Sequence, residues 1–203
     1  MKEGVSGWYI RAKRILDVTC AVALLILFLP IMLLIGLVVR LTSSGEAIFR
    51  QMRVGKDGVL FCCYKFRTMR REAPQSCPTA ALEDAERYIT PVGRFLRRSS
   101  LDELPQLFNV LRGDMSLVGP RPLIPEEAWV HGMRHRTGID RLRPGMTGLA
   151  QVRGRDALSD GEKVRMDLRY ARRLSFRTDL LILLQTILRV FRGEDIREGV
   201  ADA

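Results

Sequence analysis

The chain has 203 residues, of which 47% are hydrophobic and 28% charged, and its formal net charge is +10. This composition excludes a disordered chain, and the length suits one domain with a real core, or a modest domain with an appendage. Arginine supplies 28 of the 33 basic residues, and its planar guanidinium binds phosphate in a bidentate way. The charge therefore indicates an anionic partner, which could be nucleic acid, a phosphorylated ligand or an acidic membrane surface.

An uncharged apolar run extends over 22 residues, from Val18 to Val39. As a straight helix it would be about 33 Å long, against about 30 Å for the hydrocarbon core of a bilayer. Pro30 divides the run, and a proline removes a backbone hydrogen bond and kinks a helix. Basic residues flank both ends, which favours keeping both flanks cytoplasmic. Membrane insertion is predicted, and these residues leave open a re-entrant hairpin that turns at Pro30 and a spanning helix.

After this run the pattern changes to that of a folded domain. Asp57-Gly58 lies between two β-rich stretches and predicts a hairpin turn. Thr90-Pro91 has the pattern of a helix N-cap followed by a proline at the first helical position. The domain is therefore expected to contain a small β-hairpin followed by helices.

Two stretches rich in glycine, proline and arginine, 113–125 and 141–155, show little apolar periodicity. Long irregular segments of this kind inside a compact domain are usually functional loops. Apolar residues at helical spacing over 176–191 predict an amphipathic helix, which either packs in the core or lies on the bilayer surface.

Two adjacent carboxylates, Asp102 and Glu103, stand where a helix is expected to begin. Ser100 and Glu103 match the S-x-x-E capping box, and Asp102 suits the positive end of the helix dipole. Pro105 moves the expected helix start toward the two acids, because in a longer helix its ring would meet a backbone carbonyl. Since helix starts bind phosphate and arginines flank this stretch, the pair is either an ordinary cap or part of a phosphoryl site.

Five stretches carry a resemblance to a known family: "KRILD", "YKFRTM", "LRRSSLDELPQLFNVLRGDMSLVGPRPL", "LRPGMTGLAQVRGR" and "DLRY". In this order they resemble the bacterial sugar transferases, which are monotopic phosphoglycosyl transferases, over about Lys13 to Leu188. The resemblance implies a membrane enzyme that transfers a sugar-1-phosphate from a UDP-sugar to polyprenyl (undecaprenyl) phosphate and releases UMP. That reaction is the first membrane step in assembling a capsule, exopolysaccharide, O-antigen or glycoprotein.

The resemblance also implies roles for individual residues. Asp102 occupies the position of the nucleophile that forms a covalent phosphosugar intermediate, and Glu103 that of the residue that holds Mg²⁺. Carboxylates can act as nucleophiles at phosphorus, and Mg²⁺ screens the repulsion between anions. Further positions match family motifs expected to bind the substrate or its phosphates: Arg97, Arg121, Lys65, Arg67, Gln151, Arg155 and Asp167.

The resemblance favours the re-entrant hairpin, with the catalytic domain on the cytoplasmic face of the bacterial inner membrane. Family members often carry serine before the hairpin proline, whereas this chain has Leu29. The expected fold is α+β in three parts. They are a membrane re-entrant helix–break–helix over 1–45, a compact, mainly helical catalytic domain with interfacial helices over 46–192, and a polar tail over 193–203.

Two other functions compete with the transferase. A metal-dependent phosphatase or nucleotide-sugar hydrolase could use the same carboxylates with water as the acceptor, although a soluble hydrolase would not need the apolar run. A non-catalytic basic membrane protein could recruit acidic partners. Nucleic acid is not an expected partner, since aromatic residues make up only 7% of the chain and do not alternate with basic ones. The expected partners are a UDP-sugar, polyprenyl phosphate and membrane lipid, and a homodimer remains open.

Overall fold

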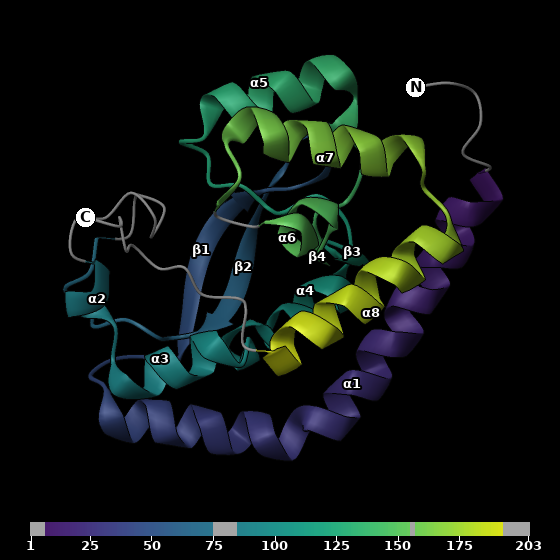
Figure 1. Cartoon of the computed structure of the whole chain (residues 1–203). Coiled ribbons are helices and arrows are strands. Elements are labelled where there is room, and N and C mark those ends of the chain that lie inside the picture. Colours follow the sequence, from purple (N-terminus) through teal and green to yellow (C-terminus); the bar gives the residue numbers. More distant parts are fainter. Residues whose placement is uncertain (1–6, 75–84, 155–156, 193–203) are drawn as a thin grey trace.

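The computed structural model describes residues 7–74, 85–154 and 157–192. Over these residues the chain is mainly helical, with a small antiparallel hairpin and a short parallel strand pair (Figure 1). The predicted tail over 193–203 lies outside the described residues, and the predicted division at residue 45 stays a prediction. The elements are α1 (Gly7–Thr42), β1 (Ile48–Val54), η1 (Lys56–Gly58), β2 (Leu60–Phe66), α2 (Ala85–Tyr88), α3 (Pro91–Arg98), η3 (Leu101–Glu103), α4 (Gln106–Arg112), β3 (Ser116–Val118), α5 (Ala128–Thr137), η4 (Ile139–Arg141), β4 (Gly145–Thr147), α6 (Leu149–Arg153), α7 (Asp160–Arg172) and α8 (Phe176–Arg192).

The apolar run lies inside one long helix, α1, which bends in its middle. Figure 1 shows two arms of α1 that meet at a sharp angle. Pro30 lies inside the helix, and sharp kinks occur almost always at proline, which lacks an N–H and pushes against the carbonyl one turn earlier. The expected helix–break–helix is therefore corrected to a bend in a continuous helix, because the proline disturbs one turn of the hydrogen-bond ladder and the helix then resumes.

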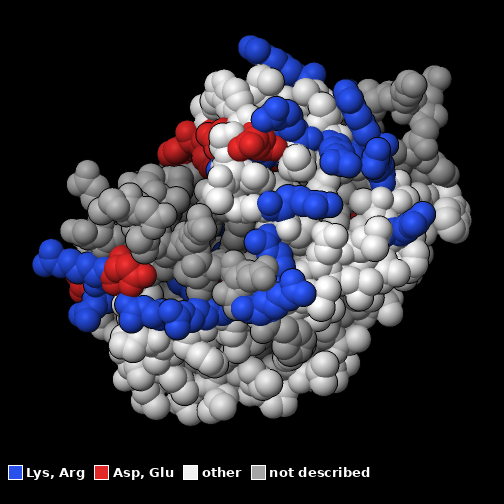
Figure 2. All heavy atoms as spheres, viewed as in Figure 1, with Lys and Arg blue, Asp and Glu red and all other residues white. Residues whose placement is uncertain are grey.

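The outer surface of α1 is apolar. Large side chains such as Ile26, Leu27, Leu33 and Leu34 are exposed along it. In Figure 2 the lower edge of the molecule, which α1 forms, is white, and basic side chains lie above it. By length and composition α1 is the one helix in the described part of the chain that could cross a membrane. A continuous exposed apolar surface of this size is typical of a protein that associates with a membrane.

The first arm of α1 is bound to the rest of the molecule by polar groups. Arg14 donates from Nη1 to the Val110 carbonyl (2.6 Å) and from Nη2 to the Leu111 carbonyl (3.0 Å), at the C-terminal end of α4. Asp17 is buried and accepts hydrogen bonds from the Ser116 hydroxyl and the Leu117 amide of β3. Two charged residues next to the apolar run therefore face the protein and not the solvent.

The second arm packs on the same domain through apolar side chains. Met32, Ile35 and Val39 form a buried cluster with Phe66 of β2 and Leu96 of α3. Because α3 lies along this arm (Figure 1), the C-terminal half of α1 shares its core with the hairpin. Both arms of α1 thus contact one domain.

The predicted hairpin is confirmed. β1 and β2 are antiparallel, with Ile48 opposite Phe66 and Val54 opposite Leu60. Asp57 (φ 54°) and Gly58 (φ 77°) both have positive φ in the connection, which is the geometry that an Asp-Gly hairpin turn requires.

The two glycine- and proline-rich stretches that were expected to be loops form a short parallel ladder. Ser116 lies opposite Gly145, and Val118 opposite Thr147. Parallel strands only three residues long carry too little periodicity to be recognised in a sequence. The ladder joins the two stretches into one structure.

The predicted amphipathic helix is present as α8, and most of its apolar residues face outward. Phe176, Leu180, Leu184 and Ile187 are exposed, so the regularly spaced residues do not form the core of this chain. The buried positions of α8 include Asp179, which accepts hydrogen bonds from Tyr170 of α7 and from Tyr9 and Lys13 of α1 at 2.6–2.9 Å.

Candidate active site

The two adjacent carboxylates lie on a 3-10 turn, η3, that is separate from the following α-helix. α4 begins at Gln106, directly after Pro105. Ser100 has a positive φ of 53° and its side chain makes no cap hydrogen bond to η3, so the expected capping box is wrong. An N-cap residue needs an extended backbone, and the left-handed conformation of Ser100 does not provide it. By contrast, Thr90 caps α3 as predicted, accepting from the Gly93 amide at 2.9 Å.

Lys65 of β2 is the partner of Glu103. The Lys65 ammonium lies 2.6 Å from Oε1 of Glu103, and both side chains are largely buried. Asp102, on the same turn, is 8% exposed. The structure therefore brings Lys65 together with the predicted catalytic pair.

Two arginines from other elements add positive charge to this group. Burial lowers the pKa of Arg53 from its usual value, and the nearby Arg121 guanidinium lowers it further, while Glu103 opposes the shift. Burial raises the pKa of the Cys63 thiol beneath the group, and Lys65 and Arg53 oppose that shift. Arg53 thus lies between the two sides of this group, close enough to interact with both Glu103 and Arg121. We call Arg53, Lys65, Glu103 and Arg121, together with Asp102, the charged cluster.

Arg53 was missed from the sequence. It lies on β1 among many arginines, and nothing in its local pattern separates it from a solvent-exposed one. Its burial arises only when the hairpin packs against the segment after β3, where Arg53 Nη1 donates to the Pro122 carbonyl at 3.2 Å.

The predicted phosphate-binding Arg97 lies on α3, directly before the turn that carries the acids. Its Nε donates to the Thr68 hydroxyl at 2.8 Å. Thr68 is buried, and its carbonyl accepts a hydrogen bond from the Thr90 amide. The start of α3, the end of the hairpin and Arg97 therefore hold one another in place.

Three other predicted residues bind partners outside the charged cluster, and a fourth is not among the described residues. Arg67 donates to the Ser44 carbonyl at the end of α1. Gln151 donates to the Met146 carbonyl, and within the described residues its buried Oε1 has no hydrogen-bond partner. Asp167 is buried in an ion pair with Arg134. Arg155 lies outside the described residues.

Asn109 of α4 is a supporting residue that the sequence did not single out. Its side chain accepts from the Tyr64 amide (3.1 Å) and donates to the Cys62 carbonyl (2.7 Å) and to Asp114 (3.2 Å). It is 0% exposed. Since Lys65 follows on the same strand, this amide fixes the distance between Lys65 and the turn before α4.

The two carboxylates could bind a divalent cation only if a substrate supplied further ligands. Among residues 7–74, 85–154 and 157–192, no group of three or more His, Cys, Asp or Glu side chains could hold a metal ion. Mg²⁺ is commonly bound by one or two carboxylates together with phosphate oxygens and waters. Asp102 and Glu103 fit that donor set.

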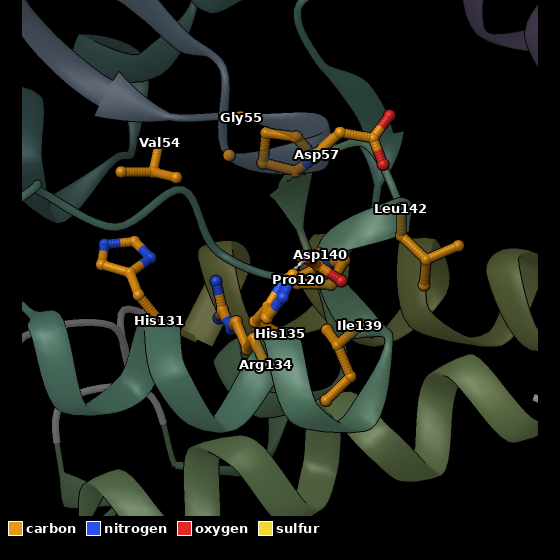
Figure 3. Close-up of a pocket in the computed structure, with 12 residues that line it drawn as sticks. Val54, Gly55, Asp57, Pro120, His131, Arg134, His135, Ile139, Asp140 and Leu142 are labelled. Carbon is orange, nitrogen blue, oxygen red and sulfur yellow. Dashed lines mark hydrogen bonds and ion pairs between the residues drawn. The ribbon is translucent and has the colours of Figure 1, made fainter.

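A cavity of about 270 Å³ lies elsewhere, between the hairpin turn and α5 (Figure 3). His131, Arg134 and His135 of α5 line it, together with Pro120. None of the described site residues predicted from the sequence is in its lining. The cavity adjoins the charged cluster along the chain, since Val54 and Pro120 in its lining are next to Arg53 and Arg121.

Comparison with known proteins supports an assignment to a family. The profile of the family described as bacterial sugar transferase matches residues 8–193. The chain is 40% identical over 199 residues to undecaprenyl-phosphate galactose phosphotransferase of Salmonella typhimurium, covering 90% of this chain and 41% of that protein. It is 43% identical over 188 residues to UDP-glucose:undecaprenyl-phosphate glucose-1-phosphate transferase of Caulobacter vibrioides, covering 86% and 68%.

A third relative has nearly the same length. The uncharacterized sugar transferase EpsL of Bacillus subtilis is 42% identical over 186 residues, which cover 92% of this chain and 90% of that protein. The family profile spans almost the whole chain, including α1 and the charged cluster. The chain therefore belongs to the bacterial sugar transferase family.

Proposed function

We propose that this chain is a phosphoglycosyl transferase that moves a sugar-1-phosphate from a UDP-sugar to a polyprenyl phosphate. The observation that carries the proposal is the charged cluster: two adjacent carboxylates on one turn, with the Lys65 ammonium 2.6 Å from Glu103 and two arginines close by. Carboxylates supply a nucleophile, and the cations offset the charge of a diphosphate. The printed names of the Salmonella and Caulobacter relatives describe undecaprenyl-phosphate sugar transferases, which supports this reaction class.

In the first half of the reaction, a carboxylate oxygen of Asp102 attacks the β-phosphorus of the UDP-sugar. The bond from that phosphorus to the bridging oxygen breaks, and UMP leaves with the electron pair. The product is an acyl phosphate, a mixed anhydride between the Asp102 carboxylate and the sugar phosphate. In the second half, a phosphate oxygen of polyprenyl phosphate attacks the same phosphorus and releases the Asp102 carboxylate.

The remaining residues of the charged cluster, together with Arg97 of α3, bind and orient anions. Arg121 and Arg97 are expected to hold phosphate oxygens in bidentate fashion. Lys65 keeps Glu103 in place while no substrate is bound and becomes available to a phosphate oxygen when Glu103 takes another partner. Glu103, with Asp102, would hold Mg²⁺, which when bound screens the repulsion between the attacking carboxylate and the diphosphate.

The bend in α1 supports a re-entrant topology with the catalytic domain on the cytoplasmic face of the bacterial inner membrane. A straight spanning helix would place its two ends on opposite sides of the bilayer. Here both arms of α1 contact the same domain, one through Arg14 and Asp17 and the other through Val39. The exposed apolar faces of α1 and α8 suit lipid contact.

The test mixes the solubilised full chain with Mg²⁺, undecaprenyl phosphate and a panel of radiolabelled UDP-sugars. We expect UMP release and a labelled lipid for at least one donor. Without the acceptor, the label should remain covalently on the protein. Release of UDP in place of UMP, or of UMP without labelled lipid, would contradict the transferase and favour a hydrolase.

Two variants test the roles proposed for the two carboxylates. Asp102→Asn should lower turnover by about 10³-fold or more, abolish covalent labelling and keep the fold, because asparagine has the same shape. Glu103→Gln should weaken the dependence on Mg²⁺. Asp160→Asn, which alters an exposed carboxylate at the start of α7, is the matched control and should retain activity. Near-normal turnover in Asp102→Asn would remove its role as nucleophile.

A further inference from the structure

The segment that carries Arg121 is held by its backbone carbonyls. Four consecutive carbonyl oxygens each accept a hydrogen bond, the donors come from β1, α5 and β4, and two of the four residues are prolines. The donors are the Gly145 amide to Pro120 (2.8 Å), Arg134 Nη1 to Arg121 (2.8 Å), Arg53 Nη1 to Pro122 (3.2 Å) and the Val54 amide to Leu123 (2.9 Å). Since prolines fix φ, this backbone has little freedom left.

The donor to the Arg121 carbonyl is itself fixed. Arg134 Nη2 and Nε donate to Oδ2 of Asp167 at 2.6 and 3.1 Å. The planar guanidinium therefore uses two nitrogens on Asp167 and directs the third, Nη1, at the Arg121 carbonyl. Figure 3 shows the Arg134 side chain rising from α5 toward the segment that contains Pro120.

Both side chains of this pair are buried, although Arg134 also lines the cavity between the hairpin turn and α5. Asp167 is 1% exposed and Arg134 is 8% exposed. Burial raises the pKa of the Asp167 carboxyl, and the Arg134 charge opposes that rise. A group so enclosed and already paired does not offer its charge to a phosphate, so any effect on a substrate has to pass through the Arg121 backbone.

We propose that Arg134 and Asp167 are positioning residues that orient the Arg121 guanidinium toward the other residues of the charged cluster. Asp167 holds the Arg134 fork, and the fork holds the Arg121 carbonyl, so the side chain leaves the backbone in one direction. The role of Arg121 as a phosphate ligand rests on the proposed function, whereas the fixing of its backbone does not. Asp167 thereby affects the UDP-sugar only indirectly, through Arg134 and Arg121, and does not bind it.

Arg134→Lys is the first test variant. It keeps a positive charge for Asp167, but a single ammonium cannot hold Asp167 and the Arg121 carbonyl in the same fork. We expect kcat/KM for the UDP-sugar to fall by about 10- to 100-fold, because a small misplacement of a binding group causes a loss of this size. Asp167→Asn, the second variant, should lower it in the same direction and keeps the test decisive if Arg134→Lys does not fold.

A double-mutant cycle separates positioning from a general structural role. In an Arg121→Gln background, Arg134→Lys should change kcat/KM by less than about twofold, since the group it orients is gone. Arg143→Lys is the matched control. Arg143 also donates to a backbone carbonyl, that of Gly113 at 2.8 Å, and this change should leave kcat/KM unaltered. Equal losses with and without Arg121 would overturn the proposal.

Hydrogen exchange gives a readout that needs no activity. Amides of residues 119–124 should exchange about tenfold faster in Arg134→Lys, the effect of one lost hydrogen bond on local opening, and at the wild-type rate in Arg143→Lys. Unchanged exchange in both Arg134→Lys and Asp167→Asn would overturn the proposal. Faster exchange in a chain that transfers no sugar phosphate would support the positioning of the backbone and contradict the proposed function instead.

Discussion

The side chain of Asn109 takes the place of a neighbouring strand at the free edge of the hairpin. A strand partner would accept from one backbone amide and donate to the carbonyl two residues away, and the carboxamide does both with Tyr64 and Cys62. A single residue on α4 thus joins a helix to a sheet without a third strand. The Lys65–Glu103 ion pair spans the same junction.

Removing this amide should therefore damage both stability and the charged cluster. Asn109→Ala leaves the Tyr64 amide and the Cys62 carbonyl without partners, at about 1–3 kcal/mol for each buried group. We expect a clear drop in the unfolding temperature of the detergent-solubilised protein. Arg112→Ala is the control: the exposed Arg112 on the same helix also bonds to Tyr64, yet it should cost under about 1 kcal/mol. Similar drops in the two variants would contradict this role for Asn109.

At the scale of elements, close backbone contact holds the β3–β4 ladder together. A Cβ on Gly145 would lie 2.1 Å from the Gly119 amide nitrogen, and a Cβ on Gly148 would lie 2.1 Å from the Gly119 carbonyl oxygen. Backbone atoms cannot move aside as the end of a side chain can. Gly145 and Gly148 are therefore required by the close approach of their backbone to Gly119, two residues before Arg121.

Gly145→Ala should for that reason separate β3 from β4. Overpacking should lower the free energy of unfolding by about 1–3 kcal/mol. Gly132→Ala provides an opposite control, since a Cβ there meets nothing within 4 Å and Gly132 lies inside α5. Alanine in a helix interior is favoured over glycine by roughly 0.5–1 kcal/mol. The unfolding temperature should fall in Gly145→Ala and rise in Gly132→Ala. A neutral Gly145→Ala would mean that the ladder is dispensable.

These elements also show how far the sequence could predict the fold. The Asp57-Gly58 turn and the Thr90 cap were predicted correctly because each depends on a few adjacent residues. The capping box at Ser100 failed because this residue has a left-handed backbone, and Glu103 pairs with a distant lysine.

The parts of the site that the sequence missed depend on long-range packing. The short parallel ladder, buried Arg53 and buried Asn109 form only when segments far apart in the chain meet. The candidate catalytic pair could be identified from the sequence motifs, whereas the supporting residues could be identified only from the structure.

At the scale of the whole molecule, α1 is both the most apolar element and one of the best anchored. Its first arm is joined to α4, β3 and α8 by Arg14, Asp17 and Lys13. Its second arm packs below α3 and the hairpin. Basic residues beside the apolar run were expected to flank a membrane, yet Lys13 and Arg14 bind the catalytic domain instead. Both arms of the bent α1 are therefore held by one domain.

This arrangement predicts that the two ends of α1 lie on one side of the membrane. Single cysteines replacing Trp8, Ala47 and Val59 in a cysteine-free background would report the start of α1, its exit and the catalytic domain. Trp8 and Val59 are 75% and 67% exposed, so a maleimide can reach them. With a membrane-impermeant maleimide added to spheroplasts, we expect all three to react only after the membrane is permeabilised. For the first arm to leave the domain, Lys13 would have to separate from the buried Asp179 of α8, and Asp17 from Ser116 and Leu117 of β3. Labelling of position 8 in intact spheroplasts, with 47 and 59 protected, would show that α1 spans the bilayer and that the docked first arm is not its state in the membrane.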